Sequence, residues 1–257
     1  MTRADRLPDL YRADERTPRG VLAEYSLVEG SDYRFWQRLH GRPLLNGARA
    51  GTAADDLRRA FVDPGAPGTA KALALLDVTA IATRADALDY TDDIADVPNA
   101  NWGAGYELIE RFPDGSSVWE VVAPPAPAVA FLRSPGFGGP EKPEGHLIGY
   151  PLLQRRGEIE VRAKAPGRVR LSFETEAPSA ESHVLRVSGA SGEVAFPLKG
   201  RRAVSFVAWV PRGVSRLTVT VEPTVLGTPV EISAPRARRT SGTPSVRAEP
   251  IDPNPGW

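Results

Sequence analysis

The sequence predicts an α+β protein of two domains, a small α/β domain followed by an antiparallel β-sandwich of jelly-roll type. Between residues 20 and 83, short β-prone segments alternate with amphipathic helical segments, and this order is typical of an α/β layer. Beyond residue 128, apolar residues recur at every second position in successive runs, which is typical of half-buried strands. The segment Ala123–Ala128, APPAPA, separates the two patterns, because proline fits neither a helix interior nor a central strand.

The boundary at this segment defines the expected domains. We expect the α/β domain over residues 18–123 and the sandwich over residues 128–237. The terminal segments, 1–17 and 238–257, are polar and show little periodicity, so we expect them to be loosely ordered tails.

In the first domain, Val21–Leu27 is β-prone, and Ser31 or Asp32 can cap a helix that ends before Gly41. A short extended segment over residues 43–46 follows. This stretch predicts a strand, a helix and a second strand in succession.

Two more helices, Ala53–Phe61 and Ala70–Leu76, and a buried strand, Val78–Thr83, complete a βαβααβ order. That order favours a mainly parallel sheet. Tyr106–Phe112 and Ser117–Val122 flank the turn Pro113-Asp114-Gly115, and this arrangement predicts a β-hairpin.

The second domain contains enough alternating runs for about eight or nine strands. Each run is bounded by Gly, Pro or Ser. The runs lie within residues 129–132, 146–153, 159–163, 169–173, 185–187, 194–198, 204–210, 217–221 and 230–232.

The composition narrows the class of protein. Lys plus Arg and Asp plus Glu each number 32 in 257 residues, so there is no general basic field for phosphates and we expect no nucleic acid partner. The chain has no cysteine, which excludes disulfides and cysteine-ligated zinc. No apolar run approaches the roughly 20 residues that span a bilayer, and the charged start lacks a signal-peptide core, so we expect the chain as given to be soluble.

Three segments together carry a resemblance to a known family. They are YRFWQRLHGRPLLNG at 33–47, ALALLDVTAIATRADA at 72–87 and YELIERFPDGSSVWEVVAPPAPA at 106–128. In this order they resemble the C-terminal extracytoplasmic soluble region of bacterial multi-spanning membrane glycosyltransferase-like proteins, the class similar to dolichyl-phosphate-mannose mannosyltransferases. The resemblance spans residues 18–223, with a local departure at 76–80, where the family more often has a Gly-Val-Arg-Tyr-like sequence.

The resemblance implies a non-catalytic accessory region. In the family, the membrane helices and an acidic external loop carry the chemistry, and neither occurs in this chain. The implied location is therefore extracytoplasmic, in the cell envelope. The implied partners are the membrane portion of the parent protein and a glycan or lipid-linked sugar.

The helix of the first stretch and its flanks carry a set of candidate sugar-binding side chains. They combine aromatic faces with amide, imidazole and carboxylate groups, the mixture that recognises sugars. The set is Glu24, Tyr33, Trp36, Gln37, His40 and Asn46. The alternative is structural: Trp36 belongs to a core, His40 closes a helix C-terminus and Asn46 belongs to a turn.

Trp209 is a second candidate for sugar binding. Val204, Phe206, Ala208 and Val210 share one face of a strand, so Trp209 must point to the other face. An outward tryptophan can stack on a sugar ring. The alternative is that it packs against a loop or a neighbouring domain.

Other chemistry finds little support in the sequence. The acidic segment 86–96 lacks the glycine and glutamate spacing of an EF-hand, and we expect no metal, no cofactor and no catalytic residue.

Two alternatives to the accessory role remain. One is a structural interaction module of the cell envelope that binds no sugar. The other is a glycan hydrolase using paired carboxylates such as Glu24 and Asp32, which would need to face a cleft about 5 to 9.5 Å apart.

Overall fold

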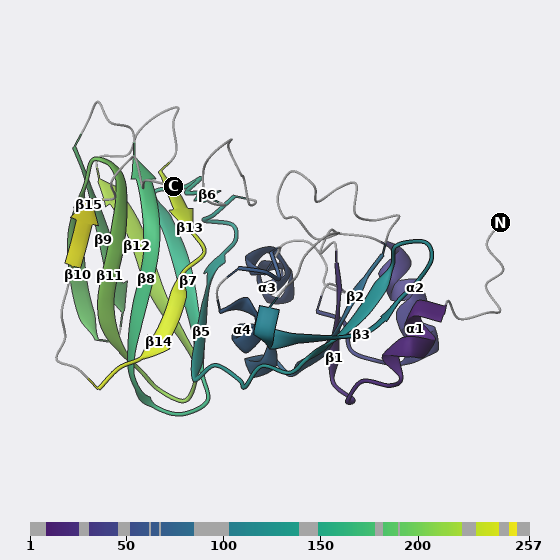
Figure 1. Cartoon of the computed structure of the whole chain (residues 1–257). Coiled ribbons are helices and arrows are strands. Elements are labelled where there is room, and N and C mark those ends of the chain that lie inside the picture. The colour runs from purple at the N-terminus through teal and green to yellow at the C-terminus, as the bar shows by residue number, and fades with distance from the viewer. Residues whose placement is uncertain are drawn as a thin grey trace. The chain divides into compact units, whose positions relative to one another are not determined.

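The computed structural model describes residues 9–25, 31–45, 52–61, 63–66, 68–84, 103–138, 149–177, 182–189, 191–222, 230–241 and 247–250. The chain divides into two compact units, Met1–Ala126 and Pro127–Trp257 (Figure 1). Each unit is described by itself below. Within the described residues, no helix has the length and apolar character needed to cross a membrane.

The first unit is built on a four-stranded sheet of order β1-β2-β4-β3. Its strands are β1 (Val21–Tyr25), β2 (Val78–Thr83), β3 (Tyr106–Arg111) and β4 (Ser117–Val121). Strands β1 and β2 pair in parallel, and an isolated parallel bridge joins Leu22 to Leu44. The expected hairpin is present as β3 and β4.

The expectation of a mainly parallel sheet is not met. Strand β4 pairs antiparallel with both β2 and β3, so β1 and β2 form the sheet's one parallel pair of named strands among the described residues. The reason lies in the hairpin. Its tight turn over residues 113–115 fixes β3 and β4 as antiparallel neighbours, and β4 then adds to β2 without the long crossover that a parallel partner requires.

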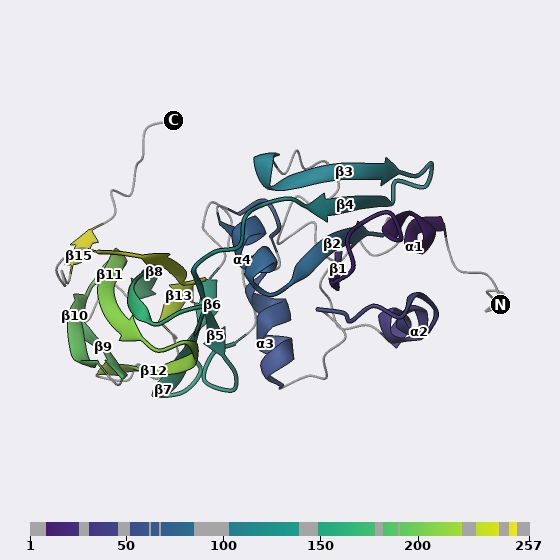
Figure 2. The same ribbon diagram turned by 90° about the horizontal axis from the view of Figure 1, so that it is seen from below.

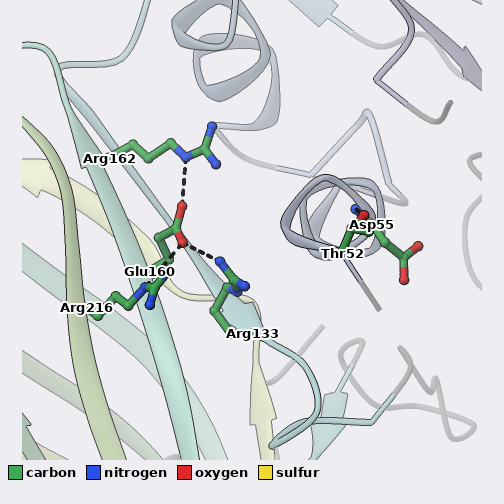
Figure 3. A network of polar contacts seen from close by, with 6 residues as sticks. All are labelled: Thr52, Asp55, Arg133, Glu160, Arg162 and Arg216. Carbon is green, nitrogen blue, oxygen red and sulfur yellow. Dashed lines mark hydrogen bonds and ion pairs between the residues drawn. The ribbon is translucent and has the colours of Figure 1, made fainter. Parts of the chain in front are cut away.

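Helices cover both faces of this sheet. They are α1 (Asp9–Asp14), α2 (Ser31–His40), α3 (Ala53–Ala60) and α4 (Thr69–Leu75). Figures 1 and 2 show α1 and α2 on one side of the sheet and α3 and α4 on the other. The Tyr25 hydroxyl donates to the Phe61 carbonyl at 2.6 Å, at the end of α3. At its start, the backbone amide of Asp55 donates to Thr52 Oγ1 at 3.3 Å, a side-chain cap (Figure 3).

The N-terminal segment differs from the loosely ordered tail that the sequence predicted for residues 1–17. Residues 9–14 form α1, and Leu10, Tyr11 and Ala13 are buried against Leu22, Ala80, Ala82 and Val118 of the sheet. These three apolar residues of α1 pack on the sheet together with side chains such as Trp36 and Leu44. A helix this short shows no periodicity over a sequence window, which is why it was missed.

The second unit is an antiparallel β-sandwich, as predicted. One sheet consists of β10 (Gly192–Leu198), β9 (His183–Gly189), β12 (Gly213–Glu222), β7 (Arg156–Ala163) and β5 (Ala128–Arg133), in that order. The other consists of β15 (Arg247–Pro250), β11 (Gly200–Val210), β8 (Gly167–Ala177), β13 (Glu231–Ser233) and β6 (Gly149–Pro151), with β14 (Arg236–Arg239) also paired to β8. The residues predicted to face inward, such as Ile159, Leu171 and Val219, lie in one buried core.

The C-terminal segment also departs from the sequence prediction of a loose tail at 238–257. Strand β14 pairs with β8 and includes residues 238 and 239, and β15 pairs with β11. These strands join the sheet through backbone hydrogen bonds. Their sequences, RARR and RAEP, lack the alternation of apolar residues that predicts a strand.

A close backbone contact fixes the segment after β5. A Cβ atom on Gly136 would lie 2.6 Å from the Cα atom of Gly157 and 2.8 Å from the carbonyl oxygen of Arg156. The next residue, Phe137, is buried and forms a bridge with Leu152. Glycine at 136 therefore allows two stretches of main chain to touch.

Candidate functional site

Glu24, one of the predicted ligand residues, lies inside the first unit. Strand alternation places Leu22 and Glu24 on the face that α1 covers. The side chain is fully buried, and the Tyr11 hydroxyl donates to its Oε2 at 2.7 Å. The carboxylate is therefore an acceptor for an internal hydrogen bond and does not face solvent.

Trp36 and His40 of α2 lie against the same tyrosine. The Trp36 ring centroid is 5.9 Å from that of Tyr11, and the His40 ring stacks on Tyr11 at 5.1 Å. His40 Nδ1 accepts a hydrogen bond from the Arg42 amide at 3.1 Å. Burial, assisted by the charge of Arg42, lowers the pKa of His40 to about 4. The imidazole is therefore neutral at pH 7.

Of the other three predicted ligand residues in the first unit, the structure describes the side chain of one, Gln37. Gln37 Nε2 donates to the Arg42 carbonyl at 3.1 Å, a bond within the turn that follows α2. Tyr33 belongs to α2, but its side chain lies outside the described ones, as does all of Asn46. The structure thus gathers Glu24, Trp36 and His40 around Tyr11, a residue that sequence reasoning assigned to a tail and did not consider.

Arg42 joins the segments that surround the cluster at Tyr11. Its guanidinium donates to Thr17 Oγ1 at 2.7 Å, to Thr79 Oγ1 at 2.6 Å and to the carbonyls of Pro18 and Gly20. These bonds join the segment before β1 to β2 and to the end of α2. The cluster around Tyr11 therefore resembles the packed interior of a domain more than an open ligand site.

The carboxylate pair suggested for a hydrolase receives no support from Glu24. A fully buried carboxylate beneath Tyr11 does not face a cleft, as glycoside hydrolysis requires. The side chain of Asp32 lies outside the described ones, and so does the acidic segment 86–96. Within the described residues, no three His, Asp or Glu side chains are grouped to hold a metal ion.

Trp209 is in a different situation. It lies near the end of β11, with Ala208 and Val210 buried in the core on either side of it, and it is 53% exposed. The Ser191 hydroxyl accepts from the Trp209 amide at 3.1 Å and donates to the Trp209 carbonyl at 2.9 Å. Both backbone groups therefore point away from β8, so Trp209 and its partner Arg168 form a non-hydrogen-bonded pair, in which side chains approach more closely.

The outward residues around Trp209 form three cross-strand rows. Trp209 lies opposite Arg168; Val207 lies opposite Arg170, which lies opposite Arg238; Ser205 lies opposite Ser172, which lies opposite Arg236. We call these eight residues the Trp209 face. They share one face because the intervening residues of β11 and β8, such as Phe206 and Leu171, point into the core.

The other sheet carries a charged cluster on its outward side. Glu160 of β7 is only 2% exposed, and its carboxylate is 2.6 Å from Arg133, 2.9 Å from Arg162 and 3.9 Å from Arg216 (Figure 3). The Arg162 guanidinium also lies 5.4 Å from the centroid of Phe131. Three cations surround one anion, which makes Glu160 the centre of a structural network.

The fold and these surfaces define a protein with one unit built on a mixed four-stranded sheet between helices and a β-sandwich unit that presents an exposed tryptophan among arginines. No protein-family model and no curated protein matches the sequence. Solved structures with local similarity include the isomalto-dextranase of Arthrobacter globiformis T6 complexed with panose (TM-score 0.36, 13% identity, 49% of this chain and 26% of that chain). Others are a family 35 carbohydrate binding module from Clostridium thermocellum (0.30, 14%, 44% and 92%) and a module of Cellvibrio mixtus lichenase 5A with cellotriose (0.30, 10%, 41% and 88%).

This chain thus spans about a quarter of the isomalto-dextranase that it resembles. Similarity at these TM-scores does not assign a function to the chain.

Proposed function

We propose that this chain is a non-catalytic glycan-binding region whose sandwich unit holds a sugar on the Trp209 face. The observation that carries the proposal is the exposure of Trp209, at 53%, on a strand whose neighbouring residues are buried. Indole and sugar rings stack because each has a flat, weakly polar face, and the polar groups at the rim supply hydrogen bonds. Arg168, directly opposite Trp209 on β8, carries such a group.

The first unit is a weaker location for the sugar. Trp36 is partly buried against Tyr11, and Glu24 is fully buried. A ligand at these residues would have to displace α1 from the sheet. Trp209 needs no such rearrangement, so the proposal uses the second unit alone.

The test is a binding screen of the whole chain against soluble glycans and lipid-phosphate sugars, observed by NMR. The variant is Trp209→Ala, and the matched control is Val214→Ala, which removes an exposed apolar side chain from the other sheet. Saturable binding that Trp209→Ala abolishes and Val214→Ala preserves is the expected result. Binding unaffected by Trp209→Ala would refute the placement on this face.

The accessory role completes the proposal. The resemblance noted in the sequence supports a location outside the membrane, attached to the membrane portion of a glycosyltransferase-like parent that would carry the chemistry. A lipid-linked sugar of that parent is a candidate ligand. The isolated chain should then transfer or hydrolyse no sugar; detectable turnover on a lipid-phosphate sugar would contradict the proposal.

A structural interaction module is the second candidate function, and the same observation favours it. An exposed tryptophan on a flat sheet can also bind a protein partner in the cell envelope. If no glycan in a broad panel binds to the chain, the structural interaction module becomes the favoured function.

A further inference from the structure

Helix α1 lies on the sheet of the first unit through contacts that include the ring of His40. We propose that α1 is a strap which mild acid releases from the sheet, with His40 as the group that takes up the proton. This inference goes beyond the proposed function and does not depend on it, because it concerns the first unit alone. It adds a conformational switch to that unit.

Helix α1 is short, and one of its side chains makes the directed contacts. A helix of six residues is marginal by itself, so its place depends on what it touches. The Tyr11 hydroxyl donates to Glu24 Oε2 at 2.7 Å, and the Tyr11 ring stacks on His40 at 5.1 Å with an angle of 14° between the planes. Displacing α1 therefore uncovers one face of the imidazole to water.

The hydrogen bonds of His40 define a neutral ring. Nδ1 accepts from the Arg42 backbone amide at 3.1 Å, so the proton of the neutral imidazole is on Nε2. Nε2 is buried and has no hydrogen-bond partner in the described part of the chain. A second proton, on Nδ1, would face the Arg42 amide with donor against donor and abolish this bond. The closed arrangement therefore accommodates the neutral ring and disfavours the imidazolium.

The charges around His40 act in the same direction. The positive charge of Arg42 opposes a second charge on the imidazole, and Arg38 belongs to the same last turn of α2. Glu24, the carboxylate of this cluster, accepts the bond from Tyr11. No ion pair joins His40 to a carboxylate within the described residues. Nothing described there would compensate an imidazolium in the closed arrangement.

Arg42 connects His40 to the chain that leads out of α1. Its guanidinium donates to Thr17 Oγ1 at 2.7 Å and to the Pro18 carbonyl at 3.1 Å, while its backbone amide donates to His40. One residue thus bonds both the imidazole and the segment between α1 and β1. Loss of the bond to His40 would loosen the attachment of α1 at its C-terminal side.

The ion pairs near α1 are exposed and hold it less firmly. Asp9 pairs with Arg12 inside the helix at 3.5 Å, and Arg16 pairs with Glu110 of β3. All four side chains are open to solvent, where ion pairs contribute little. A variant of Glu110 can therefore separate their effect from that of His40.

The size of the response follows from two pKa values of His40. Burial lowers the pKa to about 4 while α1 is in place, and a solvated histidine has a pKa of about 6.5. Between pH 7.5 and pH 5, the open form takes up a proton that the closed form does not, so the equilibrium constant for opening should rise about 30-fold. Opening would uncover the sheet face that carries Leu22 and Glu24, together with Trp36 of α2.

The experiment is amide hydrogen exchange of the full chain, observed by NMR at pH 7.5 and pH 5. Each exchange rate is divided by the intrinsic rate of the same amide at the same pH, which gives a protection factor. The probes are the amides of Glu15 and Arg16, which donate to the carbonyls of Arg12 and Ala13 at the end of α1. Their protection factors should fall about 30-fold at pH 5 and should be lower at both pH values than those of β2 and β4.

Two variants identify the group that takes up the proton. His40→Gln keeps an acceptor for the Arg42 amide but does not titrate, so the protection factors of the α1 probes should change by less than about 2-fold between the two pH values. Glu110→Gln is the control. It removes the exposed pair with Arg16 and should lower protection at both pH values while the roughly 30-fold ratio between them remains.

Three results would overturn the proposal. The first is equal protection of the α1 probes at the two pH values in the wild-type chain. The second is a fall in protection that survives His40→Gln, which would assign the proton to another group such as Glu24. The third is the same protection factor for α1 as for β2 and β4, which would show that the whole unit unfolds together. The first and third need only the wild-type chain, so they decide even where His40→Gln does not fold.

Discussion

Replacing Glu160 by glutamine tests whether the charged cluster on β7 holds the sandwich together. Glu160 is 2% exposed and Arg133, its nearest partner at 2.6 Å, is 16% exposed. Removing one partner of a buried pair leaves an uncompensated charge and costs about 3 to 5 kcal/mol. Arg162 and Arg216 are more open to solvent, and exposed ion pairs contribute less than about 1 kcal/mol each.

Glutamine keeps an acceptor oxygen, so we take the lower end of that range, about 3 kcal/mol. For a unit of the size of Pro127–Trp257, this corresponds to a fall in melting temperature of about 10 °C. The assay is chemical denaturation followed by far-UV circular dichroism, where the midpoint should fall without a change in slope.

The control is Glu174→Gln. Glu174 binds Arg201 at 2.7 Å, but both side chains are about a third exposed, so the expected cost is less than about 1 kcal/mol. A double-mutant cycle of Glu160→Gln with Arg133→Gln should show coupling of about 1 kcal/mol or more. The reasoning is refuted if Glu160→Gln costs no more than Glu174→Gln.

Three further predictions concern stability. The pKa of His40, measured by NMR titration, should lie near 4. The pKa of histidine in an unfolded chain is about 6.5, so between these two pH values the folded state binds fewer protons than the unfolded state. The free energy of unfolding should therefore fall as the pH drops from about 6.5 to 4. Tyr11→Phe removes the hydrogen bond to the buried Glu24 carboxylate and should cost about 1.5 to 3 kcal/mol in urea denaturation. Gly136→Ala forces a Cβ against main-chain atoms at 2.6 and 2.8 Å and should lower the melting temperature of the sandwich, with a cost of about 1 to 3 kcal/mol.

One result would contradict each of these three stability predictions. A His40 midpoint above pH 6 would mean that the imidazole is solvated. Tyr11→Phe should cost clearly more than Leu39→Ala, because Leu39 is 46% exposed; equal costs would show that the buried bond contributes nothing net. An unchanged melting temperature for Gly136→Ala would show that the segment after β5 can move away.

The sandwich was predictable because its signal is local. Alternation in a run such as Leu217, Val219 and Val221 marks the inward face directly, and all three residues are buried. Helix α1 and strands β14 and β15 were not predictable, since they are short and carry no such pattern. The antiparallel pairing of β4 with β2 was also missed, because the order of helices and strands along the chain does not show which strand a hairpin will pair with.

The candidate sites divide in the same way. The outward direction of Trp209 followed from alternation on one strand. The arginines around it did not, because Arg168 and Arg238 are distant in sequence and only the register of β14 on β8 brings them to one face. Glu24 was misread for a related reason: the sequence contains Tyr11, but nothing in it shows that a short helix lays this tyrosine over the carboxylate.

The bonds between Ser191 and the backbone of Trp209 also bear on solubility. Where Trp209 lies, β11 has β8 on one side, and on the other side β15 pairs only with residues 202–205 among the described residues. An open strand edge is a template on which another chain can add a strand. One hydroxyl from the turn between β9 and β10 occupies both the donor and the acceptor of that edge. At the position where a large aromatic side chain is displayed at the rim of the sheet, the backbone amide and carbonyl are thus already bonded and cannot pair with a strand of a second copy.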